Sequence, residues 1–362
     1  MDIKRDYYED IRLLGSGAKR FWFGVMMLAL AVTPFLLPGH VLSDVNFIAI
    51  NVIVAIGLNI LVGFTGQVSL GHAGFFAIGA YATVLLMSAA QFVPFPLALL
   101  AAGLIAALFG FVLGLPSLKL EGPYLAIATL GFGMAITQII GRFSVFGGRD
   151  GIQVPEVHYL DRLFVEYAGM TASAAKAADL YFIIIVFAVA MTIMARNIIK
   201  TRVGRAFIAI RDDDIAAQSM GVHVTLYKTL SFAVSAFFTG VAGGLYAIWL
   251  GYINPESFGF IMSVLFLAMV VVGGVGSIMG SVLGAIVISF LDLNLKQNTI
   301  VQIPVLGNVL VMFTDAVMDT NGIAYVSYII FGLIMMLIVV FEPLGLFGFW
   351  IRIKKYWKTW PF

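Results

Sequence analysis

The stretch "GFTGQVSLGHAGFFAIGAY" (residues 63–81) interrupts the longest uncharged tract of the chain. It holds five glycines together with Gln67, Ser69 and His72, whereas apolar residues dominate on both sides of it. Glycine is a poor helix former, so we expect residues 63–71 to be poorly helical. The core of a soluble protein gives no reason for this mixture of glycines and polar side chains. The role of the stretch therefore depends on whether water or lipid surrounds the chain.

The composition is that of a membrane protein. Hydrophobic residues make up 61% of the 362 residues and charged residues only 11%, and the mean hydropathy is +1.03. Soluble domains carry roughly 25% charged residues, and a helix needs about 20 apolar residues to cross the hydrocarbon of a bilayer. Uncharged tracts occur at residues 21–43, 45–118, 122–141, 180–195, 229–255, 257–291 and 320–341. We therefore predict an all-α polytopic membrane protein. The chain has no cysteine, which leaves no disulfide or thiolate metal site.

The number of spans follows from where these tracts break. Seven segments lie near 21–37, 45–63, 71–90, 96–116, 123–141, 180–196 and 228–250, and a last one runs from about 325 to 341. The tract 257–291 is too long for one ordinary helix, and the glycine cluster 273–277 within it predicts two short spans. Ten spans place both basic ends and most of the 21 Lys and Arg on the cytoplasmic side, as the positive-inside rule requires. One long helix there would give nine spans and termini on opposite sides.

Ten spans divide the chain into three parts. A cytoplasmic segment (1–20) comes first, a transmembrane domain (21–342) follows, and a cytoplasmic basic tail (343–362) ends the chain. The outer loops would lie at about 142–179 and 292–324, and the inner loop at about 197–227. The first apolar tract ends without a small-residue cleavage site, so we expect a retained helix and not a signal peptide.

Small residues at four-residue spacing predict where the helices pack, because lipid supplies no hydrophobic force between helices. The candidates are Gly240 and Gly244 in one span, and Gly276, Gly280 and Gly284 in another.

Two interpretations stay open for residues 63–81. They could form a packed helix interface, or they could line a water-filled cavity, where irregular backbone and polar side chains are tolerated at membrane depth. Neighbouring spans hold no acid that could orient a Ser69–His72 pair, and the other histidines fall in different loops. We therefore predict neither a hydrolase nor a metal site.

The inner loop "RNIIKTRVGRAFIAIRDDDIAAQSMGVHVTLYK" (196–228) has the signals of a short helix. Asp212, Asp213 and Asp214 suit a helix N-terminus, and Gly221 suits the C-terminal stop. The pattern predicts about two turns of helix between Asp213 and Met220. A helix this short is marginal in water, so it must pack on its own membrane domain or on a partner.

This loop resembles the "EAA…G" loop of ABC importer permeases, because Ala216-Ala217 is followed by Gly221. Ile215 stands where that family often has glutamate. With "GLNILVGFTGQVSLGHAGFFAIGAY" (57–81), "GGLYAIWLGYINPESFGF" (243–260) and "VVVGGVGSIMGSVLGA" (270–285), the chain resembles LivM-type permeases of branched-chain amino-acid ABC importers. The resemblance covers most of the chain from residue 45 on.

The resemblance implies a pore-forming permease of type II-like architecture in the bacterial cytoplasmic (inner) membrane, and not an enzyme. It implies transport of branched-chain (hydrophobic) amino acids. The implied partners are two ABC ATPase subunits, a LivH-like second permease and a periplasmic substrate-binding protein, within the lipid bilayer and without nucleic acid. No cofactor would be bound by this chain, and ATP would be used by the partner ATPase, since the sequence has no G-x-x-x-x-G-K-[ST] loop. In that family the loop forms the helix that couples to the ATPase, which assigns coupling to Asp212, Asp213, Asp214, Ala216, Ala217 and Gly221.

Weakly polar residues in the spans predict a translocation pathway, namely Asn51, Asn59, Gln67, Ser69, His72 and Gln138. The alternative is that these groups only bond between helices, at about 0.6 kcal/mol each. Three other functions remain open: a urea or amide ABC permease, an ion-coupled secondary transporter and a structural scaffold. Against the second, the acidic residues nearest the spans are expected at their edges, at Asp44, Glu256, Asp292 and Glu342.

Overall fold

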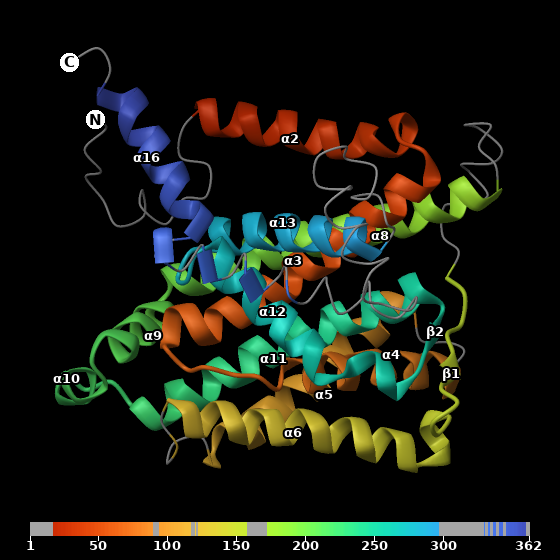
Figure 1. Ribbon diagram of the computed structural model, residues 1–362, viewed down its shortest axis with the longest axis horizontal. Helices are drawn as coiled ribbons and strands as arrows, with labels where there is room; N and C mark the ends of the chain where they lie inside the picture. The colour runs from red at the N-terminus through yellow and green to blue at the C-terminus, as the bar shows by residue number, and fades with distance from the viewer. Residues whose placement is uncertain are drawn as a thin grey trace, which may run out of the picture.

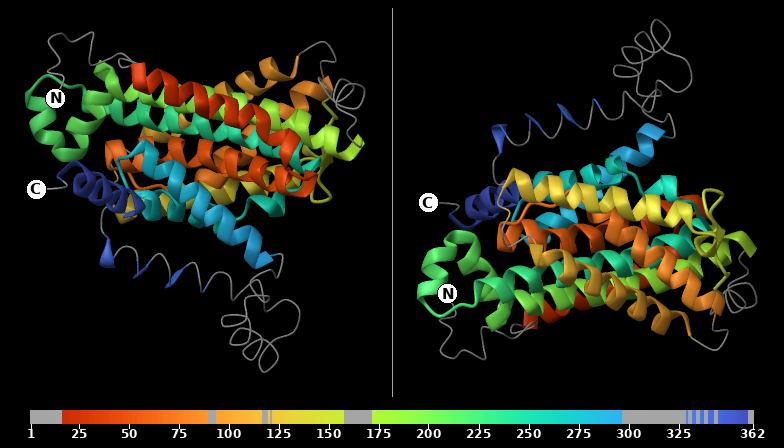
Figure 2. Two further views of the ribbon diagram at one scale, coloured as in Figure 1. Left: turned by 90° about the horizontal axis from the view of Figure 1, so that it is seen from above. Right: turned by 90° about the horizontal axis from the view of Figure 1, so that it is seen from below.

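The computed structural model describes residues 17–89, 94–116, 120, 122–157, 172–296 and 345–359, with eight further positions between 329 and 342. Most of its helices run side by side along the long axis of the molecule (Figures 1 and 2). The long ones are α2 (Gly17–Leu36), α3 (Gly39–Thr65), α4 (His72–Ala89), α5 (Phe95–Gly114), α6 (Pro123–Arg142), α8 (Ala172–Lys200), α11 (Val224–Leu250), α12 (Phe260–Gly273) and α13 (Ile278–Lys296). Residues 1–16, most of the predicted outer loop 292–324 and much of the predicted last span lie outside the described residues.

A helix covers each of the seven separate spans predicted before residue 250. Within the described residues, six helices are long and apolar enough to cross a membrane: α3, α4, α5, α6, α8 and α11. The apolar part of α2, together with α12 and α13, is shorter. The chain is thus a multi-pass, all-helical membrane protein, while the count of ten spans and the side of the termini stay predictions.

Three helices extend beyond the predicted ends of their spans, and the added helical residues include acidic ones. Helix α8 begins at Ala172 and not near 180, because the Ala-rich run before the span is a good helix former. It carries Asp179, which is buried. Asp44 lies inside α3 and the buried Asp292 lies inside α13. Asp44 and Asp292 thus lie near the ends of α3 and α13, their position at the membrane edge stays a prediction, and α8 begins inside the predicted outer loop 142–179.

Helix α11 lies at the centre of the bundle and packs against α3, α4 and α5. Its glycines lie where the neighbouring helices come closest. A Cβ on Gly79 of α4 would overlap the backbone of Gly240, and one on Gly240 would meet the Cβ of Ala106 on α5 at 2.5 Å. Gly244 lies against Thr83 and Leu99 in the same way. Contacts this close let backbone atoms of adjacent helices touch, which is how helices associate in lipid.

The glycine cluster 273–277 breaks the second tract into a helical hairpin. Gly274 and Gly276 have φ of +123° and +79°, values that side-chain-bearing residues rarely adopt. Helices α12 and α13 pack against each other on either side of this turn. A Cβ on Gly284 would overlap the carbonyl oxygen of Met269, and Gly280 lies beside Gly273. The predicted division of the tract at this cluster is confirmed.

The two ends of the bundle differ in character (Figure 1). One end carries α9 (Arg202–Asp212), α10 (Asp214–Ser219) and α16 (Gly345–Thr359). The other carries the 3-10 turns η2 (Ser144–Phe146) and η3 (Pro255–Phe258) and a two-residue antiparallel pairing of β1 (Ile152–Gln153) with β2 (Tyr252–Ile253). These strands join two loops that are about 100 residues apart in sequence.

Candidate functional site

The predicted short helix of the inner loop is present as α10, and backbone chemistry defines both of its ends. Asp213 is the N-cap, and its Oδ1 accepts a hydrogen bond from the Ala216 amide at 2.9 Å. At the other end, Gly221 donates to the Gln218 carbonyl and Val222 donates to the Ala217 carbonyl, both at 3.0 Å. This is the Schellman arrangement, and it requires the left-handed φ of +85° that Gly221 adopts. The six-residue helix is therefore closed at both ends by its own loop.

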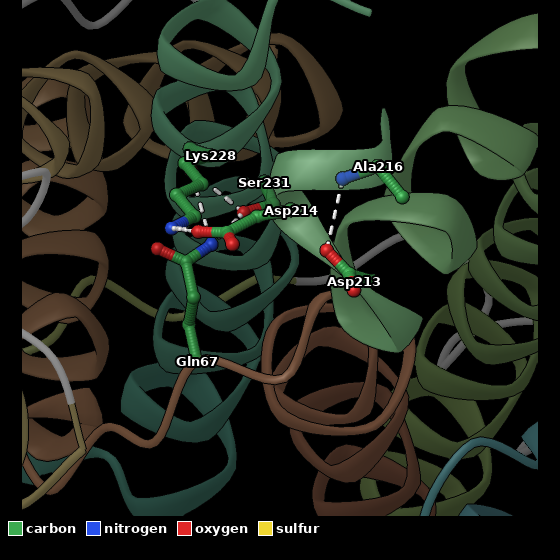
Figure 3. A network of polar contacts seen from close by, with 6 residues as sticks. All are labelled: Gln67, Asp213, Asp214, Ala216, Lys228 and Ser231. Atoms are coloured by element: carbon green, nitrogen blue, oxygen red, sulfur yellow. Dashed lines mark hydrogen bonds and ion pairs between the residues drawn. The ribbon is translucent and has the colours of Figure 1, made fainter. Parts of the chain in front are cut away.

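Two exposed apolar residues, Ile215 and Met220, form an apolar tip on helix α10, and an ion pair connects the helix to the bundle. Ile215 and Met220 are 78% and 85% exposed, whereas Ala217 is buried. Asp214 accepts a hydrogen bond from the Lys228 ammonium at 2.9 Å, on the first turns of α11 (Figure 3). This hydrogen bond and the charge of Lys228 hold the pKa of the Asp214 carboxyl below its usual range. An exposed apolar tip on an anchored helix is suited to contact another protein.

The irregular segment between α3 and α4 contacts the same turn of α11. The side-chain amide of Gln67 donates to the Ser231 hydroxyl at 2.8 Å and to the Lys228 carbonyl at 3.3 Å (Figure 3). Lys228 therefore bonds to α10 through its ammonium and to the segment after α3 through its backbone. Because of this, α10 and the break at residue 66 are connected through one residue.

A second connection runs through Arg211, at the end of α9. Its Nη1 donates to the Gly63 carbonyl at 3.1 Å, while its Nε and Nη2 donate to Asp212 Oδ1 at 3.1 and 2.8 Å. Gly66, with φ of +75°, ends α3 directly beside this arginine. The residues flanking α10 in sequence are thus tied to the last turn of α3 as well as to α11.

The interior of the break is packed and hydrogen bonded. The Ser69 hydroxyl lies 2.9 Å from His72 Nδ1, and the Ser235 hydroxyl of α11 lies 2.7 Å from His72 Nε2. The Leu70 amide donates to Thr129 of α6, and the Ala73 amide donates to Ser263 of α12. Hydroxyls on three neighbouring helices therefore satisfy backbone and side-chain groups that the break in the helix leaves without intrahelical partners.

The predicted pathway residues fall into two groups. Asn51 donates to Ser289, and Asn59 donates to the Ser277 carbonyl and Ser281 hydroxyl while accepting from the Gly276 amide. These pairings run in opposite order along α3 and α13, so the two helices are antiparallel. With Gln67, Ser69 and His72, these residues are buried in contacts between helices, whereas Gln138 lies exposed on α6. In this conformation Asn51, Asn59, Gln67 and His72 bond to neighbouring helices, whereas Ser69 bonds to His72 and the Gly71 amide within the break, and a pathway along these residues stays a prediction.

Sequence reasoning missed Arg211, Lys228 and Ser231. Basic residues on a predicted inner loop are most often topology signals, so the sequence alone does not single out Arg211 or Lys228. The Asp214–Lys228 pair is 14 residues apart, well beyond the i+3 and i+4 pairs that meet within one helix, and it forms because the chain turns at Gly221 between them. The adjacent opposite charges of Arg211 and Asp212 are a local signal of their ion pair.

Comparison with known proteins identifies the family. The family model described as "Branched-chain amino acid transport system / permease component" matches residues 41–339. The chain is 36% identical over 290 residues to the high-affinity branched-chain amino acid transport system permease protein LivM of Escherichia coli, covering 76% of this chain and 68% of that protein. Identity to LivM of Salmonella typhimurium is 34% over the same coverage. To LivH of that organism it is 25% over 65% of this chain and 78% of LivH. No solved structure matches the chain significantly. The chain belongs to the branched-chain amino-acid transport permease family and is LivM-like.

Proposed function

We propose that this chain is the membrane-spanning subunit of an ATP-driven ABC importer in the bacterial cytoplasmic membrane. Its cargo would be branched-chain amino acids handed over by a periplasmic binding protein. Two ATPase subunits and a second, LivH-like permease would complete the assembly, and ATP would bind to the ATPases alone. Similarity to both LivM and LivH supports a pairing of two related permeases.

The observation that carries the proposal is how α10 is attached to the rest of the bundle. Its apolar tip is free for a protein contact, while Asp214 and Arg211 connect its base to the ends of α11 and α3. Movement of an ATPase that held Ile215 and Met220 would therefore reach the break at residues 66–71 directly. That break contacts α6, α11 and α12, so its displacement would shift several helices together and open the bundle alternately to either side.

The cargo follows from the named relatives and fits the chemistry of the bundle. An apolar zwitterion needs no fixed charge along its path, and the buried polar side chains at the break are amides, hydroxyls and one imidazole. A binding protein that delivers the substrate would supply the affinity, so the path needs only weak polar groups.

The test is a pair of substitutions at Gly221. Gly221→Val places a β-branched residue at φ +85° and should destroy the C-terminal closure of α10, whereas Gly221→Asn retains it because asparagine tolerates this region. In proteoliposomes with the ATPases, LivH-like permease and binding protein, we expect the valine variant to lose uptake while ATP hydrolysis continues. The asparagine variant should transport like the wild type. Equal uptake by both variants would exclude α10 as the coupling element, and uptake without ATP would point to a secondary carrier.

A further inference from the structure

Helix α16 is joined firmly to the bundle at its beginning. Gly345 has φ of +64°, and a Cβ there would lie 2.7 Å from the Gly274 amide nitrogen and the Val272 carbonyl oxygen. Arg352 forms an ion pair with the buried Glu342, with Nη2 2.7 Å from Oε2. The start of α16 is therefore fixed against the turn between α12 and α13, and its direction is set relative to the bundle.

Beyond this junction, α16 leaves much of an apolar face exposed. Phe349, Trp350, Ile353 and Tyr356 each expose more than half of their surface. Their spacing of three and four residues places them on one side of the helix, at 100° per residue. Four large apolar side chains on one exposed stripe would be costly in water, so this face must have a partner.

The charged residues are placed symmetrically about that face. At 100° per residue, Arg352 and Lys354 flank the apolar stripe on its two sides, and Lys355 lies opposite it. The helix has no acidic residue. Long basic side chains at the rim of an apolar face can reach phosphate groups while the aromatic side chains enter the acyl layer. The aromatic residues are of the types that concentrate at membrane interfaces.

The position of α16 brings a membrane surface within reach. It lies at the same end of the bundle as α9 and α10 and extends away from the packed helices (Figures 1 and 2). Only a few residues separate it from the apolar stretch that ends at Phe341. A helix that starts at the edge of a membrane-spanning bundle meets lipid headgroups before any soluble partner.

We propose that α16 is an interfacial helix that binds the anionic lipid surface at the α10 end of the bundle, with Phe349, Trp350, Ile353 and Tyr356 in the membrane and Lys354 at the rim on lipid phosphates. It would fix the height and tilt of the α12–α13 turn relative to the bilayer. This proposal does not depend on the cargo or on coupling to an ATPase.

The absence of cysteine allows a direct test on the full-length protein. Ile353→Cys and Lys355→Cys, each carrying a nitroxide label, probe opposite faces of the same helical turn at exposed positions. In vesicles that contain phosphatidylglycerol, we expect the label at 353 to be accessible to oxygen and shielded from an aqueous nickel complex. The label at 355 should show the reverse. In phosphatidylcholine vesicles, the shielding at 353 should be weaker.

Removing single charges measures the electrostatic contribution to binding of α16 at the lipid surface. Lys354→Gln, made in the Ile353→Cys background, should lower the ratio of docked to undocked helix by roughly fivefold in anionic vesicles, whereas Lys355→Gln, on the opposite face, should lower it less. Equal access of the nickel complex to positions 353 and 355 in anionic vesicles would overturn the proposal. Shielding of position 353 that arose only after an ATPase subunit was added would instead assign this face to a protein partner and would equally overturn it.

Discussion

The break after α3 and the short helix α10 use the same local device in opposite surroundings. Each contains a helix end closed by a glycine of left-handed conformation, Gly66 with φ of +75° and Gly221 with φ of +85°. Gly66 lies against Arg211, and the neighbouring Gly71 lies against the backbone of α6. At Gly221, by contrast, none of the described residues comes within 4 Å of where a Cβ would be.

The difference indicates that contacts within the bundle stabilise the break, whereas α10 is available for contact with another protein. Polar groups of the break are satisfied by hydroxyls of α6, α11 and α12, so the bundle itself stabilises it. Helix α10 satisfies its own ends and leaves Ile215 and Met220 exposed. Substitutions at the break should therefore affect folding, and substitutions at α10 should affect coupling.

The largest expected effect is on protein stability, and it distinguishes substitution of Gly71 from substitution of Gly221. In Gly71→Ala, the new Cβ would overlap the Thr129 carbonyl, which is backbone and cannot move aside, so we expect a loss of about 3 kcal/mol. Gly221→Ala meets open space and costs only the left-handed conformation, about 1 kcal/mol. Thermal unfolding of the purified proteins in detergent measures both. Similar melting temperatures for the two variants would contradict the comparison.

An intermediate effect is expected from the amides of α3. Asn59→Leu removes three hydrogen bonds and leaves the Gly276 amide without its acceptor, so the free energy of unfolding should fall by about 2 kcal/mol. Asn51→Leu, the matched control, removes one bond to Ser289 and should cost about 0.6 kcal/mol. Denaturant titration of both variants gives the two values. A larger loss for Asn51 would show that the α12–α13 turn does not depend on Asn59.

The smallest expected effect on stability is at the base of α10. Asp214→Asn removes a partly exposed ion pair and should change the free energy of unfolding by less than about 1 kcal/mol, yet reduce uptake per ATP hydrolysed. Because the pKa of this carboxyl is lowered, its contribution is present above the ordinary value of about 3.9 and lost as the pH falls through the lower folded-state pKa. Lowering the pH from about 7 to about 5 should therefore leave coupling through this pair intact. A coupling loss within that interval would assign the effect to another group.

Local chemistry made much of this structure predictable from sequence. Caps at Asp213 and Gly221, the irregular segment after Gly63 and the hairpin at Gly273–Gly276 all follow from the preferences of aspartate and glycine. The ends of α8 and α13 were missed, because alanine-rich and mixed segments continue a helix beyond its apolar part. Contacts of Arg211 and Lys228 could not be predicted, since they depend on how distant helices meet.

The most direct test of the account is recovery of partners by the tagged chain from its native host in mild detergent. Wild type, Gly221→Val and Gly221→Asn would be purified in parallel, and the co-purifying proteins identified. The account predicts an ATPase and a second permease with the wild type and the asparagine variant, and loss of the ATPase with the valine variant. Purification of this chain alone, with uptake in proteoliposomes that contain no ATP, would contradict it.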